Sequence, residues 1–121
     1  MRTVLLVADR QSVIDQVHAS LASGDFDVID HPASDTAAAT AYRKDVDAVL
    51  VDMQVGSMGA MAVTRAVRAE AGTEDIPVTI LLDREADAFL AGRSGATNWL
   101  LKDAPASDLQ DAVSPASTDA S

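Results

Sequence analysis

The sequence contains three charged residues, far apart from one another, whose side chains are suited to binding a cation and transferring a phosphoryl group. Asp9, Asp52 and Lys102 each stand at the end of an apolar run. Two carboxylates that meet in one crevice can share a hard cation such as Mg²⁺, which prefers oxygen ligands and keeps several of its waters. A carboxylate beside such a cation is a nucleophile toward phosphorus, and a lysine opposite it holds a phosphoryl oxygen as a point charge. These residue types indicate phosphoryl transfer if the fold brings them together.

Polar residues at strand ends are common, because a strand must leave its sheet into water. Taken singly, each of these three residues is therefore an ordinary strand terminus. The joint pattern is more specific, since the ends of the first, third and fifth predicted strands supply an acid, an acid and a base.

Five apolar runs alternate with five segments of helical periodicity. The predicted strands span residues 3–7, 26–30, 48–51, 78–82 and 98–101. The predicted helices span residues 12–23, 34–43, 60–71, 85–94 and 105–113. This alternation with short connections predicts a parallel sheet with helices on both faces, whose functional crevice lies beyond the carboxyl ends of the strands. The weakly alternating run 26–30 is expected at an edge of the sheet.

The composition excludes several classes of function. Hydrophobic residues make up 48% of the 121 residues, which is typical of a globular domain rather than a disordered chain. The absence of cysteine rules out disulfides, zinc–thiolate sites, iron–sulfur clusters and thiol catalysis. The net charge of −10 argues against binding of nucleic acid or anionic lipid by this domain. No apolar run suits a membrane span or a signal peptide, so a cytoplasmic location is expected.

Four stretches of the sequence resemble the receiver domain of bacterial two-component response regulators, of the chemotaxis-regulator type. They are VLLVAD (4–9), DAVLVDMQVGSMG (47–59), IPVTILL (76–82) and GATNWLLK (95–102). The resemblance implies a flavodoxin-like (βα)5 fold, a doubly wound five-stranded parallel sheet with helices on both faces. The predicted receiver domain spans residues 1–113, and residues 114–121 are predicted to form a disordered tail.

The resemblance also implies roles for individual residues in a two-component phosphorelay. Asp52 aligns with the aspartate that accepts the phosphoryl group, and Lys102 aligns with the lysine that contacts it. Asp9, Asp52 and the backbone carbonyl of Gln54 align with the ligands of Mg²⁺. The implied phosphoryl donor is a histidine kinase or a phosphotransfer protein, and the domain itself is expected not to be an enzyme.

The sequence departs from the family pattern around this crevice. The family has two adjacent acids after the first strand, whereas this chain has Ala8 before Asp9, which weakens the expected metal site. The first switch position of the family carries Ser or Thr, but Leu82 has no hydroxyl. Asp83 follows it and adds a negative charge that should repel a phosphoryl dianion. Trp99 occupies the aromatic switch position, either as a switch residue or as an ordinary half-buried aromatic.

Further departures lie in the connections. The family has a proline after the lysine, often with a cis bond, whereas Asp103 here favours a trans bond that could redirect Lys102. The connection at residues 83–87 is shorter than in the family, and Pro115 shortens the last helix. Arg10 is expected in solvent at the start of the first helix, although it is long enough to reach an anion in the crevice.

Three classes of function remain open at this stage. The first is a receiver that accepts a phosphoryl group on Asp52. The second is a pseudo-receiver, an interaction module that binds its partner whether or not Asp52 is phosphorylated. The third, a cofactor enzyme on the same frame, is disfavoured because the chain has no glycine-rich phosphate loop after its first strand.

Overall fold

Five strands alternate with five α-helices in the computed structural model, which describes residues 2–22, 25–31, 34–55 and 59–114. The strands are β1 (Arg2–Val7), β2 (Phe26–Asp30), β3 (Ala48–Asp52), β4 (Val78–Leu82) and β5 (Asn98–Leu101). The α-helices are α1 (Gln11–Ser20), α2 (Ala37–Arg43), α3 (Gly59–Ala69), α4 (Ala88–Arg93) and α5 (Ala106–Val113). Two 3₁₀ turns, η1 (Ser34–Thr36) and η2 (Glu85–Asp87), precede α2 and α4.

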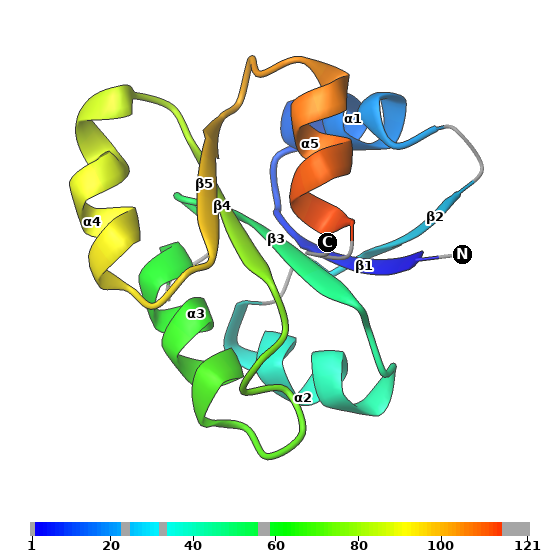
Figure 1. Ribbon diagram of the computed structural model, residues 1–121, viewed down its shortest axis with the longest axis vertical. Coiled ribbons are helices and arrows are strands. Elements are labelled where there is room, and N and C mark those ends of the chain that lie inside the picture. Colours follow the sequence, from blue (N-terminus) through cyan, green and yellow to red (C-terminus); the bar gives the residue numbers. More distant parts are fainter. Residues whose placement is uncertain (1, 23–24, 32–33, 56–58, 115–121) are drawn as a thin grey trace, which may run out of the picture.

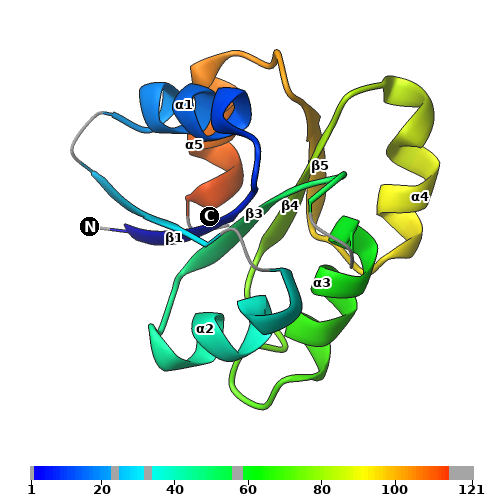
Figure 2. The same cartoon turned by 180° about the vertical axis from the view of Figure 1, so that it is seen from behind.

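The strands form one parallel sheet in the order β2-β1-β3-β4-β5. Helices α1 and α5 cover one face of the sheet, and α2, α3 and α4 cover the other (Figures 1 and 2). This arrangement confirms the doubly wound, flavodoxin-like fold that the sequence predicts. It also confirms that β2 lies at an edge and places β3, which ends in Asp52, at the centre.

The apolar runs of the central strands are buried because helices cover both sides of the sheet. All residues of β3 and β4 are buried. Along β1, Leu5 and Val7 pack into the core beneath α2 and α3, whereas Val4 and Leu6 pack against α1 and α5. The two cores thus pack against opposite faces of the sheet whose carboxyl edge carries the site residues.

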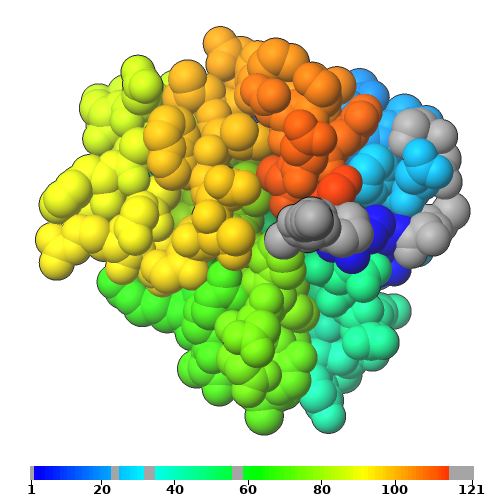
Figure 3. Space-filling view, in the orientation of Figure 1, coloured from blue at the N-terminus to red at the C-terminus, as the bar shows by residue number. Residues whose placement is uncertain are grey.

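The predicted helices differ from the observed ones mainly at their ends. The helices predicted from residues 34 and 85 each begin as a 3₁₀ turn, which leaves α4 with six residues. Helix α5 ends at Val113, in agreement with the sequence. In the space-filling view, the residues of α4, β5 and α5 form adjoining parts of one surface (Figure 3).

The predicted tail, residues 114–121, falls almost wholly outside the described residues, so the boundary at residue 113 stays a prediction. Among the helices that the structure describes, none combines the length and the apolar character needed to cross a membrane.

Candidate functional site

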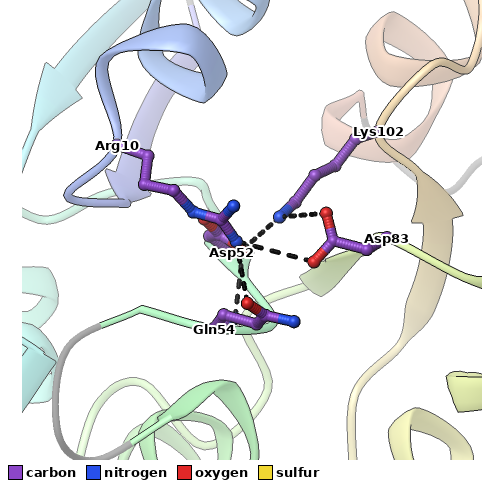
Figure 4. A network of polar contacts seen from close by, with 5 residues as sticks. All are labelled: Arg10, Asp52, Gln54, Asp83 and Lys102. Atoms are coloured by element: carbon purple, nitrogen blue, oxygen red, sulfur yellow. Dashed lines mark hydrogen bonds and ion pairs between the residues drawn. The ribbon is translucent and has the colours of Figure 1, made fainter.

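Side chains from four strand ends meet at the carboxyl edge of the sheet (Figure 4). Asp52 is the last residue of β3, while Asp83 and Lys102 directly follow β4 and β5. Arg10 is the N-cap residue of α1, just beyond β1. Because β3 lies between β1 and β4 in the sheet, Asp52 stands in the middle of this group.

The Asp52 carboxylate is buried and forms the base of the site. Its side chain has no exposed surface, and its Oδ1 atom lies 2.7 Å from Nζ of Lys102, whose side chain is 14% exposed. The backbone N–H of Gln54 donates a hydrogen bond of 3.0 Å to the same oxygen. The other oxygen, Oδ2, receives no hydrogen bond within the described part of the chain. The site thus contains a buried carboxylate oxygen that no hydrogen bond from the described residues satisfies.

Arg10 is exposed, as expected, and it also reaches the anion in the crevice. Its Nε atom lies 3.5 Å from Oδ2 of Asp52, and its Nη2 donates a hydrogen bond of 3.1 Å to Oε1 of Gln54. The side chain remains 44% exposed, so it lies over the opening of the site. The contact is possible because β1 and β3 are neighbours in the sheet, so the segment that follows β1 lies beside the end of β3.

Asp83 binds both cations of the site. Lys102 donates a hydrogen bond of 2.9 Å to its Oδ1, and Nη2 of Arg10 lies 3.5 Å from its Oδ2. The hydrogen bond from Lys102 lowers the pKa of the Asp83 carboxyl below its usual value, and the charges of Lys102 and Arg10 act in the same direction against the opposing effect of burial. The negative charge expected near the site is therefore present, but it is neutralised by two basic side chains.

The backbone positions Lys102 without the proline that the family carries. No peptide bond among the described residues is cis, so the bond between Lys102 and Asp103 is trans. The backbone N–H of Lys102 donates to the carbonyl of Leu82 at 2.9 Å, which continues the pairing of β4 with β5. Lys102 therefore points at Asp52, and the trans bond has not redirected it.

The remaining predicted residues take different places. Asp9 is exposed and immediately precedes Arg10, while Ala8 is buried in the core against α1. Leu82 has no exposed surface and packs in the core beneath α3 and α4. Trp99 is half-buried against that same core, beside a groove of about 420 Å³. Neither of these two residues belongs to the polar network that Figure 4 draws around Asp52.

A magnesium site is only partly recognisable among these residues. In the part of the chain that the structure describes, no group of three or more His, Cys, Asp or Glu residues is arranged to hold a metal ion. The feature that fits a cation is the buried Oδ2 of Asp52, which lacks a hydrogen-bond donor. Asp9 and the Gln54 carbonyl are oxygen donors of the kind that Mg²⁺ prefers.

Comparisons with known proteins identify one family. The family model described as the response regulator receiver domain matches residues 4–114. The transcriptional regulatory protein RstA of Escherichia coli is 32% identical over 107 residues, which cover 87% of this chain and 44% of RstA. The nitrate/nitrite response regulator protein NarP of the same organism is 31% identical over 73 residues, 60% of this chain and 34% of NarP. The chain thus spans less than half the length of these curated relatives.

Two solved structures are similar in fold. The receiver domain of the sensor histidine kinase PA1611 from Pseudomonas aeruginosa, described with magnesium coordinated in its active-site cleft, has a TM-score of 0.82 at 24% identity, covering 93% of each chain. The BeF3-activated N-terminal receiver domain of RstA from Klebsiella pneumoniae has a TM-score of 0.76 at 28% identity, covering 90% of this chain and 92% of that domain.

Proposed function

The chain belongs to the response regulator receiver domain family, and on that premise we propose that it receives a phosphoryl group on Asp52. Such a domain is a module of two-component signalling rather than a classical enzyme. The observation that carries the proposal is the buried Asp52 carboxylate at the end of the central strand, 2.7 Å from Lys102. The phosphoryl donor in the cell is a histidine kinase or a phosphotransfer protein.

The proposed reaction needs a nucleophilic oxygen and a cation that binds the transferred group. One carboxylate oxygen of Asp52 forms a bond to phosphorus while the P–N bond of the donor phosphohistidine breaks. The electron pair of that bond leaves on the imidazole nitrogen, so no further reactant is required. Lys102 holds a phosphoryl oxygen as a compact positive charge, in place of its present contact with Asp52.

The proposed Mg²⁺ would be held by Asp9, Asp52 and the backbone carbonyl of Gln54. When bound, it neutralises charge on the transferring phosphoryl group. The buried Oδ2 of Asp52, which has no hydrogen-bond donor among the described residues, supports this assignment. The guanidinium of Arg10 faces the same oxygen at 3.5 Å, so a metal would have to displace it. We therefore expect weaker metal binding than in a site with two adjacent acids after β1.

The alternative function is a pseudo-receiver that binds a protein partner without phosphorylation. One observation favours it: the basic side chains of Arg10 and Lys102 already neutralise the carboxylates of Asp52 and Asp83. A site of this kind can keep one conformation without receiving a phosphoryl group.

Intact mass spectrometry after incubation with acetyl phosphate and Mg²⁺ distinguishes the two functions. A receiver gains one phosphoryl group, and the Asp52→Asn variant gains none. The Asp47→Asn variant is the matched control, because Asp47 directly precedes β3 and so lies at the opposite end of the strand from Asp52. A native protein that gains no mass, and whose Trp99 fluorescence does not respond to Mg²⁺, contradicts the receiver proposal. Partner binding that is unchanged in Asp52→Asn then supports the pseudo-receiver.

A further inference from the structure

Arg10 and Lys102 hold two carboxylates in the same way (Figure 4). Asp52 presents its Oδ1 to Lys102 at 2.7 Å and its Oδ2 to Arg10 at 3.5 Å. Asp83 repeats this arrangement, with its Oδ1 at 2.9 Å from Lys102 and its Oδ2 at 3.5 Å from Arg10. The two basic side chains thus bind a second anion besides the acceptor carboxylate itself.

The two carboxylates differ in how firmly the protein holds them. Asp52 has no exposed surface and belongs to the central strand, whereas the Asp83 side chain is 33% exposed and follows β4 in a connecting segment. Arg10, the longer of the two cations, is 44% exposed. Asp83 is therefore the less firmly held of the two anions.

We propose that Arg10 and Lys102 form a binding site for a tetrahedral oxyanion, which the Asp83 carboxylate fills in this structure. A phosphoryl group on Asp52 takes the place of that carboxylate, and this second part of the proposal rests on the function proposed above. Asp83 is then an internal competitor of the phosphoryl group, and Arg10 is a phosphoryl-binding residue.

Charge balance gives the physical reason for this exchange. Arg10 and Lys102 together carry two positive charges, which the carboxylates of Asp52 and Asp83 now balance. Phosphorylation replaces the single negative charge of Asp52 by about −1.5 to −2 at neutral pH. Counted over these side chains alone, without Mg²⁺ and Asp9, the site then holds excess negative charge while Asp83 remains, and it returns close to neutrality when Asp83 leaves. Because Asp83 lies between β4 and η2, its departure changes the segment that leads through η2 into α4.

Binding of inorganic phosphate tests the oxyanion site without any phosphoryl transfer. The Asp83→Asn variant keeps the shape of the side chain and removes its charge. Asp87→Asn is the matched control, because Asp87 lies in the same connection but pairs with Arg84 instead. Phosphate is titrated at constant ionic strength in a metal-free buffer, and the NMR signals of Arg10 Nε and Lys102 Nζ are followed.

The expected result is at least ~10-fold tighter phosphate binding by Asp83→Asn than by the native protein, a change of about 1.4 kcal/mol. The control Asp87→Asn behaves as the native protein does. Adding Arg10→Gln to Asp83→Asn should abolish the gain in affinity for phosphate. If Asp83→Asn does not fold, Asp83→Ser tests the same loss of charge with a smaller side chain.

Two results overturn the oxyanion site: phosphate binding that is no tighter in Asp83→Asn, or shifts confined to residues other than Arg10 and Lys102. The outcome of the acetyl phosphate experiment is independent of the outcome of the phosphate titration. Tighter phosphate binding without any mass gain in either protein supports the oxyanion site and contradicts phosphorylation of Asp52. A mass gain in the native protein without tighter phosphate binding in Asp83→Asn supports the receiver and removes Asp83 as competitor.

Discussion

The Nζ atom of Lys102 lies 2.7 Å from Oδ1 of Asp52, although the two residues are 50 positions apart in the sequence. Both side chains are shielded from water, at 14% and 0% exposure. Charges at this depth interact more strongly than surface pairs, and a carboxylate left without its partner keeps the full cost of its burial. The pair therefore matters to folding as well as to any reaction at Asp52.

Replacing Lys102 by Met is expected to destabilise the protein by about 3 kcal/mol at neutral pH. The substitution leaves two carboxylates, Asp52 and Asp83, with Arg10 as the remaining cation of the network. Urea denaturation at pH 7, followed by circular dichroism, measures the change in the free energy of unfolding.

Lys44 provides the control for this substitution, since it is the other lysine of the chain and is exposed at the end of α2. Lys44→Met should change the free energy of unfolding by less than about 0.5 kcal/mol. Equal effects of the two substitutions would contradict the view that the contact with Asp52 is what makes Lys102 important.

The lowered pKa of the Asp83 carboxyl leads us to expect a specific dependence of the protein's stability on pH. The pKa of this carboxyl is lowered in the folded protein, mainly by the hydrogen bond from Lys102 and then by the charges of Lys102 and Arg10. A lowered pKa means that the interaction stabilises the fold fully above the usual pKa of 3.8 and is lost as the pH falls through the lower folded value. At pH 7 the native protein should therefore be more stable than Asp83→Asn by about 1 kcal/mol or less, since the pair is partly exposed.

This difference should shrink as the pH falls below 3.8 and disappear below the lowered pKa of Asp83, and urea denaturation of both proteins from pH 7 down to pH 2 measures it. Comparing two proteins cancels the effect of the other carboxyl groups. A carbon NMR titration of the Asp83 carboxyl gives the direction of the pKa shift directly. A difference in stability that persists unchanged below the pKa of Asp83 would show that its charge is not the stabilising feature.

The fold could be predicted closely from the sequence, because the apolar runs and helical periodicities that indicate it are local and recur five times along the chain. Buried strands such as Ala48–Asp52 consist of continuous apolar runs, which a sheet covered on both faces requires. The order of the strands came from the family resemblance and not from these runs. The helix ends were less predictable, since the 3₁₀ turns at Ser34–Thr36 and Glu85–Asp87 depend on local backbone geometry.

The site was predictable only where single residues match the family. The structure brings Asp52 and Lys102 together at one edge of the sheet, as the strand ends predict, while their roles in phosphoryl transfer stay a prediction. The contacts of Arg10 and Asp83 were not predictable, since each depends on the direction of a long or exposed side chain and on a partner far away in the sequence. The charge of Asp83 was expected to repel a phosphoryl group, but its two basic partners could not be read from the sequence.

Replacing Leu82 by Thr tests whether the family's hydroxyl can simply be restored at this position. Leu82 has no exposed surface and packs in the core beneath α3 and α4, with residues such as Ala60 and Ala91. The smaller, polar side chain should leave a cavity and bury a hydroxyl, which lowers the free energy of unfolding by about 2–3 kcal/mol. Urea denaturation measures this loss, and the mass gain from acetyl phosphate measures any effect on the reaction.

Leu90→Thr is the matched control for this substitution, because Leu90 lies on α4 with 40% of its surface exposed. Its expected loss of stability is less than about 1 kcal/mol. We expect Leu82→Thr to gain no more phosphoryl group than the native protein does, since the ion pairs of Asp83 with Lys102 and Arg10 are left intact. A Leu82→Thr protein that is as stable as the native one and is phosphorylated faster would show instead that this position faces the crevice and that the missing hydroxyl limits the reaction.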